Sequence, residues 1–390
     1  MDETKKLFED FPRVSKAEWL NKVEKDLKGK PLDDLYWHLE EDLTVDPFAH
    51  RDDQPEALPP IDRHQRRNDW EIGEYIIVHD VGRANREALE GLDNGVQSLG
   101  FMLYHPLADG DMNRLLAGIE MPYVSVNFGE FYPEKQPLQI LRQWIALIKE
   151  RGLDRSLING SVDFDPLLDW SEPPYDQLME AVHLVATELP GVRIVQVNGR
   201  YYHAGPEQTS RELGYTIAKG NAYLAALQER GIAPDITNRH LQMSVAMSTS
   251  YFVEIAKLRA LKILWLNVLK AYGLAEGSLP EIVGHLAPET QDDNANTNLI
   301  RAATQAMSGV IGGVDRLYIL PANYAQQEEP TPFYRRLARN VQHLLKLESH
   351  LDKVADPGAG SYYIEQLTQK LADKAWAVFQ EIDEKGEFTS

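Results

Sequence analysis

Seven polar residues stand at the ends of segments that are rich in β-branched and aromatic residues. They are His79, His105, Asp163, Asp165, His203, His285 and Asn323. Histidines can transfer protons or bind a metal ion, and carboxylates can bind a cation. No pair of them has the His-x-x-x-His or His-x-His spacing of a metal site, so no metal site is predicted. Because loops after strands are polar in any α/β protein, this pattern alone identifies no reaction.

The two aspartates have the most suggestive spacing. In the string NGSVDFD, Asp163 and Asp165 are two positions apart, which places both on one face of a strand. Carboxylates so placed could bind a cation or share a proton, and a solvated loop is the favoured alternative. Gly-x-Ser-x-Gly, phosphate-loop and kinase-type motifs are missing.

Eight segments of strand character alternate with amphipathic helical stretches and would position these residues. The segments are 70–79, 98–105, 123–129, 156–164, 192–203, 240–248, 280–287 and 315–323. Such alternation predicts parallel strands joined by helical crossovers. Eight units favour an α/β fold of the closed (β/α)8 TIM-barrel type over an open doubly wound sheet, and no Gly-x-Gly-x-x-Gly follows the first strand. In such a barrel the site lies at the carboxyl ends of the strands.

An arm and a tail flank the predicted barrel, which spans residues 70–350. Residues 1–69 are expected to form an N-terminal arm and linker, with two charge-rich helices within residues 1–45. The Pro-rich stretch that follows predicts an extended segment lying on its own barrel or on a partner chain. Residues 351–390 are expected to form a post-barrel turn, containing Asp356, Pro357 and Gly358, and one long helix.

Composition limits the classes of function. The chain carries a net charge of −20, which argues against nucleic acid as a partner, and the favoured reading of this acidity is solubility. With no cysteine it has no disulfide or thiolate metal site, and a reducing, cytoplasmic location is expected. No apolar run is long enough to predict a membrane span.

Two long strings are specific enough to indicate a family. YFVEIAKLRALKILW (251–265) and RRLARNVQHLLKLESHLDKVADPGAGSYYIEQLT (335–368) resemble the methylmalonyl-CoA mutase family, and supporting stretches extend the resemblance over nearly the whole chain. It implies a (β/α)8 barrel whose axial hole, lined by small polar side chains, admits the coenzyme A tail. It also implies isomerase chemistry on acyl-CoA carbon skeletons with adenosylcobalamin as the radical source. Many bacterial members are heterodimers in which the small subunit is a degenerate, non-catalytic copy.

The sequence departs from the family's catalytic pattern at the first strand. Active members carry Arg-Pro-Trp-Thr-Ile-Arg-Gln-Tyr there, and this chain has Asn68-Asp69-Trp70-Glu71-Ile72-Gly73-Glu74-Tyr75. Tyr75 matches the tyrosine that contacts cofactor and substrate. Asn68 and Gly73 replace both arginines, which removes the planar cations that grip carboxylate or phosphate. Glu71 adds a negative charge where active members have threonine.

Other departures lie on later strands. His240, Gln242 and Ser244 stand where active members have arginine, serine and phenylalanine. The family's fifth-strand histidine falls within 200–202, with His203 close by, and His285 is only near a missing His-x-Gln pattern. The resemblance therefore offers Tyr75, His203, His240 and Gln242 as catalytic candidates if the chain is active. The cobalamin-ligating Asp-x-His-x-x-Gly motif occurs nowhere in the chain.

Whether the axis is open depends on strand register. One face presents Ser125, Asn127, Gln242 and Ser244, which would line a polar substrate channel. The other presents Val124, Val126, Met243 and Val245, which would fill the axis as an apolar core. A slip of one residue exchanges the two faces, so both alternatives stay open.

Three functional hypotheses follow. The favoured one is a non-catalytic barrel subunit that forms a heterodimer with a catalytic mutase chain, through its arm and barrel surface. The second is an active acyl-CoA mutase barrel that borrows a cobalamin-binding domain from a separate polypeptide, and Tyr75 favours it. The third is an orphan barrel that binds an acyl-CoA or nothing. Gene neighbourhood and copurification would separate them.

Overall fold

The computed structural model describes residues 12, 14–53, 61, 68–274, 279–326 and 330–388. Eight parallel strands close into a barrel in the order β10-β3-β4-β5-β6-β7-β8-β9. The strands are β3 (Glu71–Val78), β4 (Ser98–Leu103), β5 (Ser125–Glu130), β6 (Asn159–Phe164), β7 (Gly191–Asn198), β8 (Leu241–Met247), β9 (Glu281–Leu286) and β10 (Arg316–Tyr318). Each lies within or overlaps one of the eight predicted segments, and the (β/α)8 barrel is confirmed.

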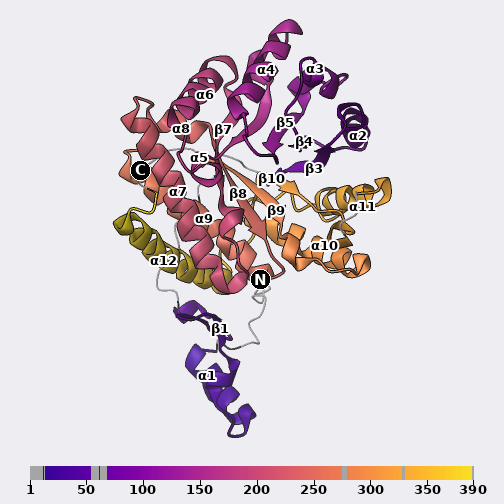
Figure 1. Cartoon of the computed structure of the whole chain (residues 1–390). Helices are drawn as coiled ribbons and strands as arrows, with labels where there is room; N and C mark the ends of the chain where they lie inside the picture. The colour runs from indigo at the N-terminus through magenta and orange to yellow at the C-terminus, as the bar shows by residue number, and fades with distance from the viewer. Residues whose placement is uncertain are drawn as a thin grey trace, which may run out of the picture.

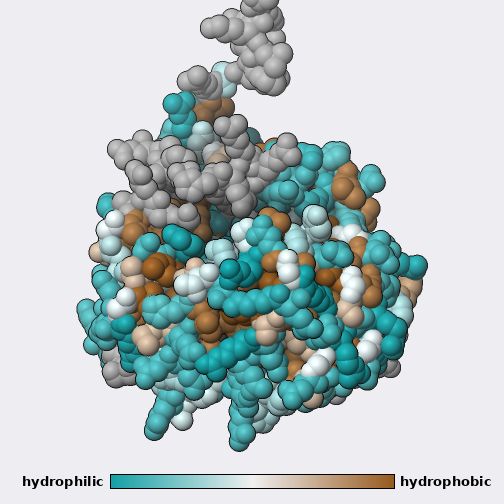
Figure 2. Space-filling model, turned by 90° about the horizontal axis from the view of Figure 1, so that it is seen from above, coloured by the Kyte–Doolittle hydropathy of each residue, from teal (hydrophilic) through white to brown (hydrophobic). Residues whose placement is uncertain are grey.

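Helices surround this barrel (Figure 1). The longer ones are α2 (Val81–Asp93), α4 (Pro137–Glu150), α6 (Tyr175–Glu188), α7 (Thr209–Glu229), α9 (Tyr251–Ala271), α10 (Ala295–Gly312), α11 (Pro332–His343) and α12 (Tyr362–Lys385). Short helices are α3 (Asp111–Leu115), α5 (Pro166–Asp169) and α8 (Pro234–Arg239). On the face seen from above, polar side chains lie at the edge and apolar ones gather towards the middle (Figure 2). None of the described helices is long and apolar enough to cross a membrane.

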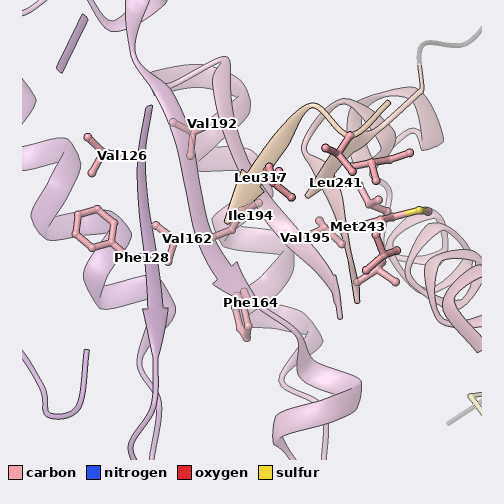
Figure 3. Close-up of a cluster of buried hydrophobic side chains, with 14 of the residues drawn as sticks. Val126, Phe128, Val162, Phe164, Val192, Ile194, Val195, Leu241, Met243 and Leu317 are labelled. Carbon is pink, nitrogen blue, oxygen red and sulfur yellow. The ribbon is translucent and has the colours of Figure 1, made fainter. Parts of the chain in front are cut away.

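The strands bury an apolar face outward against the helices (Figure 3). Phe128 meets Trp144 of α4 edge-on at 5.4 Å between ring centroids, and Val126 and Met243 belong to the same buried cluster. Alternation then turns the polar set inward, and Asn127 and Ser244 face the barrel interior. The structure thus selects the polar register over the apolar one.

The arm differs from its prediction. Helix α1 (Lys16–Leu27) begins at a capping box formed by Ser15 and Glu18. The described part of residues 1–45 contains no second helix, because the chain after Pro31 forms a 3-10 turn and an antiparallel hairpin of β1 (Trp37–Glu40) and β2 (Leu43–Val45), while residues 1–11 lie outside the described residues. The hairpin buries Leu39, Leu43 and Val45, and this apolar burial stabilises it.

One buried carboxylate fastens the hairpin to the barrel. Glu40 accepts hydrogen bonds from the backbone amide and hydroxyl of Ser210, at the start of α7, and pairs with Lys374 of α12 at 3.1 Å. Helix α1 projects away from the barrel beyond the hairpin (Figure 1). Most of the predicted Pro-rich extended segment, 54–60 and 62–67, lies outside the described residues.

The tail follows its prediction. Asp356 has a φ of +44° within the predicted turn, and α12 follows as one long helix. Arg259 of α9 joins the two, pairing with Asp356 at 3.2 Å and with Glu365 at 2.9 Å. The division into an arm (1–69), a barrel (70–350) and a tail (351–390) stays a prediction.

Candidate functional site

A cavity of about 420 Å³ opens at the carboxyl ends of the barrel strands. Its lining includes Tyr75, Asn127, Asp163, Arg200, His203, Gln242, Ser244 and His285. This volume falls within the range of small-molecule sites, roughly 300–1,000 Å³. The barrel thus brings together three of the four catalytic candidates and three of the four residues of the polar channel face.

Tyr75 belongs to a hydrogen-bonded group at the cavity floor. Its hydroxyl bonds Nδ1 of His285, and Nε2 of His285 lies 3.3 Å from Oγ of Ser244. Burial lowers the pKa of His285 well below its usual value, and the nearby Arg200 and Arg316 charges act in the same direction. Burial also raises the pKa of Tyr75. Both groups are therefore neutral at physiological pH, so that Tyr75 donates and Nδ1 accepts.

A second group links β6, β7 and β8. Nε2 of Gln242 donates to Asp163 at 3.0 Å and to Gln196 at 2.6 Å, and Gln196 donates to Ser244 at 2.6 Å. Burial raises the pKa of Asp163 to about 6, although the charge of Arg200 opposes the shift. Asp163 can therefore exchange a proton near neutral pH.

Asp163→Asn is expected to stabilise the fold by about 1–2 kcal/mol at pH 7–8 and to leave its stability almost unchanged at pH 4. The folded-state pKa of about 6 lies above the ordinary 3.8, so the folded chain holds a proton that the unfolded chain releases. Stability is then lost as the pH rises between those values. Urea denaturation across this range tests the expectation, with the exposed Asp176→Asn as control. An equal effect of Asp163→Asn at pH 4 and pH 8 would contradict it.

Arg316 fills the axis below the cavity. It is 2 % exposed, and its Nε donates to Glu71 at 3.0 Å. One terminal nitrogen donates to Asn127 at 2.6 Å, and the other pairs with Glu281. Burial opposes the charge on Arg316, but Glu281 and Glu71 outweigh it and raise the pKa. Glu71, which replaces the family's threonine, thus serves as the counter-ion of a buried arginine.

Tyr318 lies one inward position further along β10 and closes the cavity floor. Its hydroxyl is 3.1 Å from Ser98 Oγ and accepts from Asn127 at 3.2 Å, and its ring stacks on Tyr75 at 4.7 Å between centroids. The ring lies against two glycines on neighbouring strands. A Cβ at Gly73 would come within 2.8 Å of the ring, and one at Gly100 within 2.9 Å. Gly73, which stands where the family has arginine, leaves the space that this ring occupies.

Gly100→Ala is therefore expected to cost about 1–3 kcal/mol of folding stability by overpacking. The cost should shrink in a Tyr318→Leu background, because the contact of 2.9 Å is with the Tyr318 ring alone. A double-mutant cycle measured by urea denaturation gives the coupling. If the stability losses of Gly100→Ala and Tyr318→Leu were additive, the Tyr318 ring would not be in contact with position 100.

His203 lies at the cavity wall in a buried ionic cluster. Its Nδ1 is 2.8 Å from Glu212 and its Nε2 is 3.0 Å from Glu289. Glu212 also pairs with the buried Lys257 at 3.3 Å. Burial acts to raise the pKa of Glu212, but Lys257 and His203 outweigh it and lower the value. Glu212 is therefore an anion that orients His203.

The remaining candidates lie elsewhere. His240 precedes β8 at the amino end of the barrel, where Nδ1 bonds the carbonyl of Val192 at 2.7 Å and burial lowers its pKa. Ser125 donates to Glu71 at 2.6 Å, below the cavity. Of the strand-end residues, His79, His105, Asp165 and Asn323 are not among the cavity-lining side chains.

The two aspartates do not share a site. Strand β6 ends at Phe164, and Asp165 is the N-cap residue that precedes α5, so strand alternation no longer fixes its direction. Asp165 is buried and pairs with Lys219 at 2.8 Å and with the hydroxyl of Tyr223 at 2.5 Å. Among the described residues no group of three or more potential ligands could hold a metal ion.

Sequence reasoning missed Arg200, Gln196, Arg316 and Tyr318. Arg200 was visible in the string that was hard to align at the end of the fifth strand. Arg316 and Tyr318 alternate within the eighth predicted strand, so period-2 alternation could have marked them as inward-facing.

Fold and cavity together define a (β/α)8-barrel protein with an open carboxyl mouth and a filled axis. The family model described as methylmalonyl-CoA mutase matches residues 108–390. A methylmalonyl-CoA mutase small subunit of Porphyromonas gingivalis is 35 % identical over 99 % of this chain and 66 % of its own length. The small subunit of Streptomyces virginiae is 28 % identical over 98 % of this chain and 65 % of its own length. The mitochondrial enzyme of Homo sapiens is 26 % identical over 95 % of this chain and 55 % of its own length.

The chain therefore belongs to the methylmalonyl-CoA mutase family, as the resemblance predicted. It spans 66 %, 65 % and 55 % of the length of these three relatives.

Proposed function

We propose that this chain is the non-catalytic barrel subunit of a methylmalonyl-CoA mutase-type complex. The observation that carries the proposal is the filled axis. Arg316 and Tyr318 occupy the interior at 2 % and 3 % exposure, with hydrogen bonds to Asn127 and Ser98. An acyl-CoA that threads its tail along the axis would have to displace a buried arginine from two carboxylates.

The cofactor belongs with the partner in this proposal. Nδ1 of His203 contacts Glu212, and His285 contacts Tyr75 and Ser244 through its two ring nitrogens. Nε2 of His203 makes no hydrogen bond and lies 3.0 Å from the Glu289 carboxylate. Every ring nitrogen of these histidines therefore has a polar neighbour within 3.3 Å, which does not fit a free cobalt ligand, and no step of this chain is routed through adenosylcobalamin. The catalytic, cobalamin-binding chain would supply the radical chemistry of the family.

The alternative of an active barrel that borrows a cobalamin domain rests on Tyr75. In this fold Tyr75 stacks on Tyr318 and bonds His285. These contacts give Tyr75 a packing role that accounts for its presence without catalysis.

The arm offers the contact surface for the partner. Trp19 of α1 stacks on Phe48 at 4.5 Å between centroids, and Val14, Leu35 and Trp37 are 55 %, 41 % and 42 % exposed. Helix α1 buries none of its residues on its own chain. An apolar surface on a projecting arm is typical of a subunit interface.

Co-expression with the catalytic mutase subunit of the same host tests the proposal. We expect a 1:1 complex by size-exclusion chromatography with light scattering, and no turnover of methylmalonyl-CoA by this chain alone with adenosylcobalamin. Trp37→Asp should weaken the complex at least tenfold, whereas Phe333→Asp, at an exposed aromatic residue of α11, should not. Turnover by the isolated chain, or failure to associate with the catalytic subunit, would refute the proposal.

A further inference from the structure

The cavity at the carboxyl mouth holds a guanidinium that lacks a carboxylate partner. Arg200 lies in the 3-10 turn Gly199–Tyr202 after β7, and its Nε donates to Asn198 at 3.2 Å. No carboxylate of the described residues forms an ion pair with it. By contrast, the buried Arg259, Arg316 and Arg339 each pair with carboxylates. Arg200 is half-buried and lines the cavity, so its remaining donors are available to a ligand.

The charge of Arg200 acts inside the cavity. It opposes the rise in the pKa of Asp163 and contributes to lowering that of His285. His285 and Tyr75 are neutral, so neither adds a charge that would attract an anion away from Arg200. The cavity therefore presents the positive charge of Arg200 beside the neutral Tyr75 and His285, while the carboxyl groups of Asp163 and Glu289 lie elsewhere in its lining.

The walls are aromatic. Tyr104 and Phe131 stack at 5.7 Å between centroids and are 38 % and 47 % exposed, and Tyr324 also lines the cavity. On the floor, the rings of Tyr75 and Tyr318 stack upon each other. Aromatic walls of this kind favour a flat apolar body, which they can cover by stacking.

The floor limits the length of the ligand. Tyr318 lies against Gly73 and Gly100 and is 3 % exposed, so its ring would have to move before a pantetheine arm could pass along the axis. A ligand must therefore end within about 420 Å³, and its anionic group must face Arg200 rather than continue as a thioester.

We propose that the cavity binds a small free aromatic monocarboxylic acid, whose carboxylate pairs with Arg200 and whose ring stacks among Tyr104, Phe131 and Tyr324. This site rests on the filled axis but is independent of pairing with a catalytic subunit. It would make the chain a sensor or carrier of a free acid, where the family works on thioesters.

Calorimetric titration with phenylacetate tests the site. We expect saturable 1:1 binding, at least tenfold weaker binding of the neutral phenylacetamide, and none of phenylacetyl-CoA. Arg200→Gln should weaken phenylacetate binding at least tenfold. The affinity of Arg200→Lys should lie between those of the unchanged chain and Arg200→Gln. Arg86→Gln, the same change of charge on the exposed face of α2, should bind like the unchanged chain.

The binding experiment needs a control for folding, and three of its outcomes would contradict the inference. Thermal melts of each variant confirm that the fold is retained, since Arg200 has no ion pair to lose. No saturable binding of phenylacetate at millimolar concentration, or equal binding by Arg200→Gln, would overturn this inference and leave the subunit proposal standing. Competition between phenylacetyl-CoA and phenylacetate would show instead that the axis opens, which would overturn both.

Discussion

Lys219→Met is expected to lower the free energy of unfolding by about 3–5 kcal/mol, because it leaves a buried carboxylate without its cation. Lys219 is fully buried on α7, and its Nζ lies 2.8 Å from Asp165. The amide of Asn198 and the hydroxyl of Tyr223 remain as donors to Asp165, but neither carries charge. The methionine matches the volume of the lysine stem, so the loss reports the charge and not a cavity.

Urea denaturation at pH 7.5 measures this loss. Lys149→Met, which breaks a surface pair with Glu188, should cost no more than about 1 kcal/mol. Adding Asp165→Asn to Lys219→Met should recover part of the stability, since a neutral amide is less costly to bury. Burial already raises the pKa of Asp165 and Lys219 opposes the rise, so the deficit of the variant should shrink as the pH falls. A loss equal to that of Lys149→Met would mean that the pair is not buried.

Glu74→Gln is expected to cost about 3–5 kcal/mol as well, because two buried arginines share this carboxylate. Arg335 and Arg339 of α11 approach Glu74 of β3 at 2.7 Å and 2.9 Å, and their other partner Glu90 is partly exposed. The pairs fasten the last barrel helix to the first strand, where the barrel closes. The amide keeps the shape of the side chain and removes only the charge.

Chemical denaturation and hydrogen exchange together check this expectation. Glu180→Gln, in a surface pair with Arg142, serves as the control and should change stability by no more than about 1 kcal/mol. Amides of α11 should exchange faster in Glu74→Gln than those of α6, if the clamp is local. If the α11 and α6 amides were equally protected from exchange and stability were unchanged, Glu90 alone would be sufficient to pair with Arg335 and Arg339.

The architecture was predictable because each strand and helix carries its own period. Apolar residues alternate in the strand segments, and the barrel order follows from the count of units. The arm was not predictable in the same way, because Leu39 and Leu43 are four residues apart, which is helical spacing. The hairpin that they form instead depends on the barrel for its burial. The fifth strand was drawn too long for a related reason. Tyr201 and Tyr202 favour strands, yet the chain turns after Asn198 into a 3-10 segment.

The cavity was predictable in part. The rule that sites lie at carboxyl strand ends located Asp163, His203 and His285, and the family resemblance added Tyr75 and Gln242. Asp165 and His240 lie elsewhere, because Asp165 is the N-cap residue of α5 and His240 precedes its strand. The filled axis could not be read from any one segment, since Tyr318 fits only because two other strands carry glycine opposite it.

Because Tyr318 depends on these glycines, the family's arginine cannot be introduced at position 73 without other changes. An arginine restored at position 73 would collide with the Tyr318 ring and with the backbone oxygen of Leu317, which a Cβ there would approach to 2.6 Å. Tyr318 would first have to be replaced by a smaller residue. Arg316 and its partners Glu71 and Glu281 would have to be substituted together, so that no buried charge is left unpaired. Single substitutions towards the family pattern are therefore expected to give overpacked or charge-unbalanced variants of lower stability.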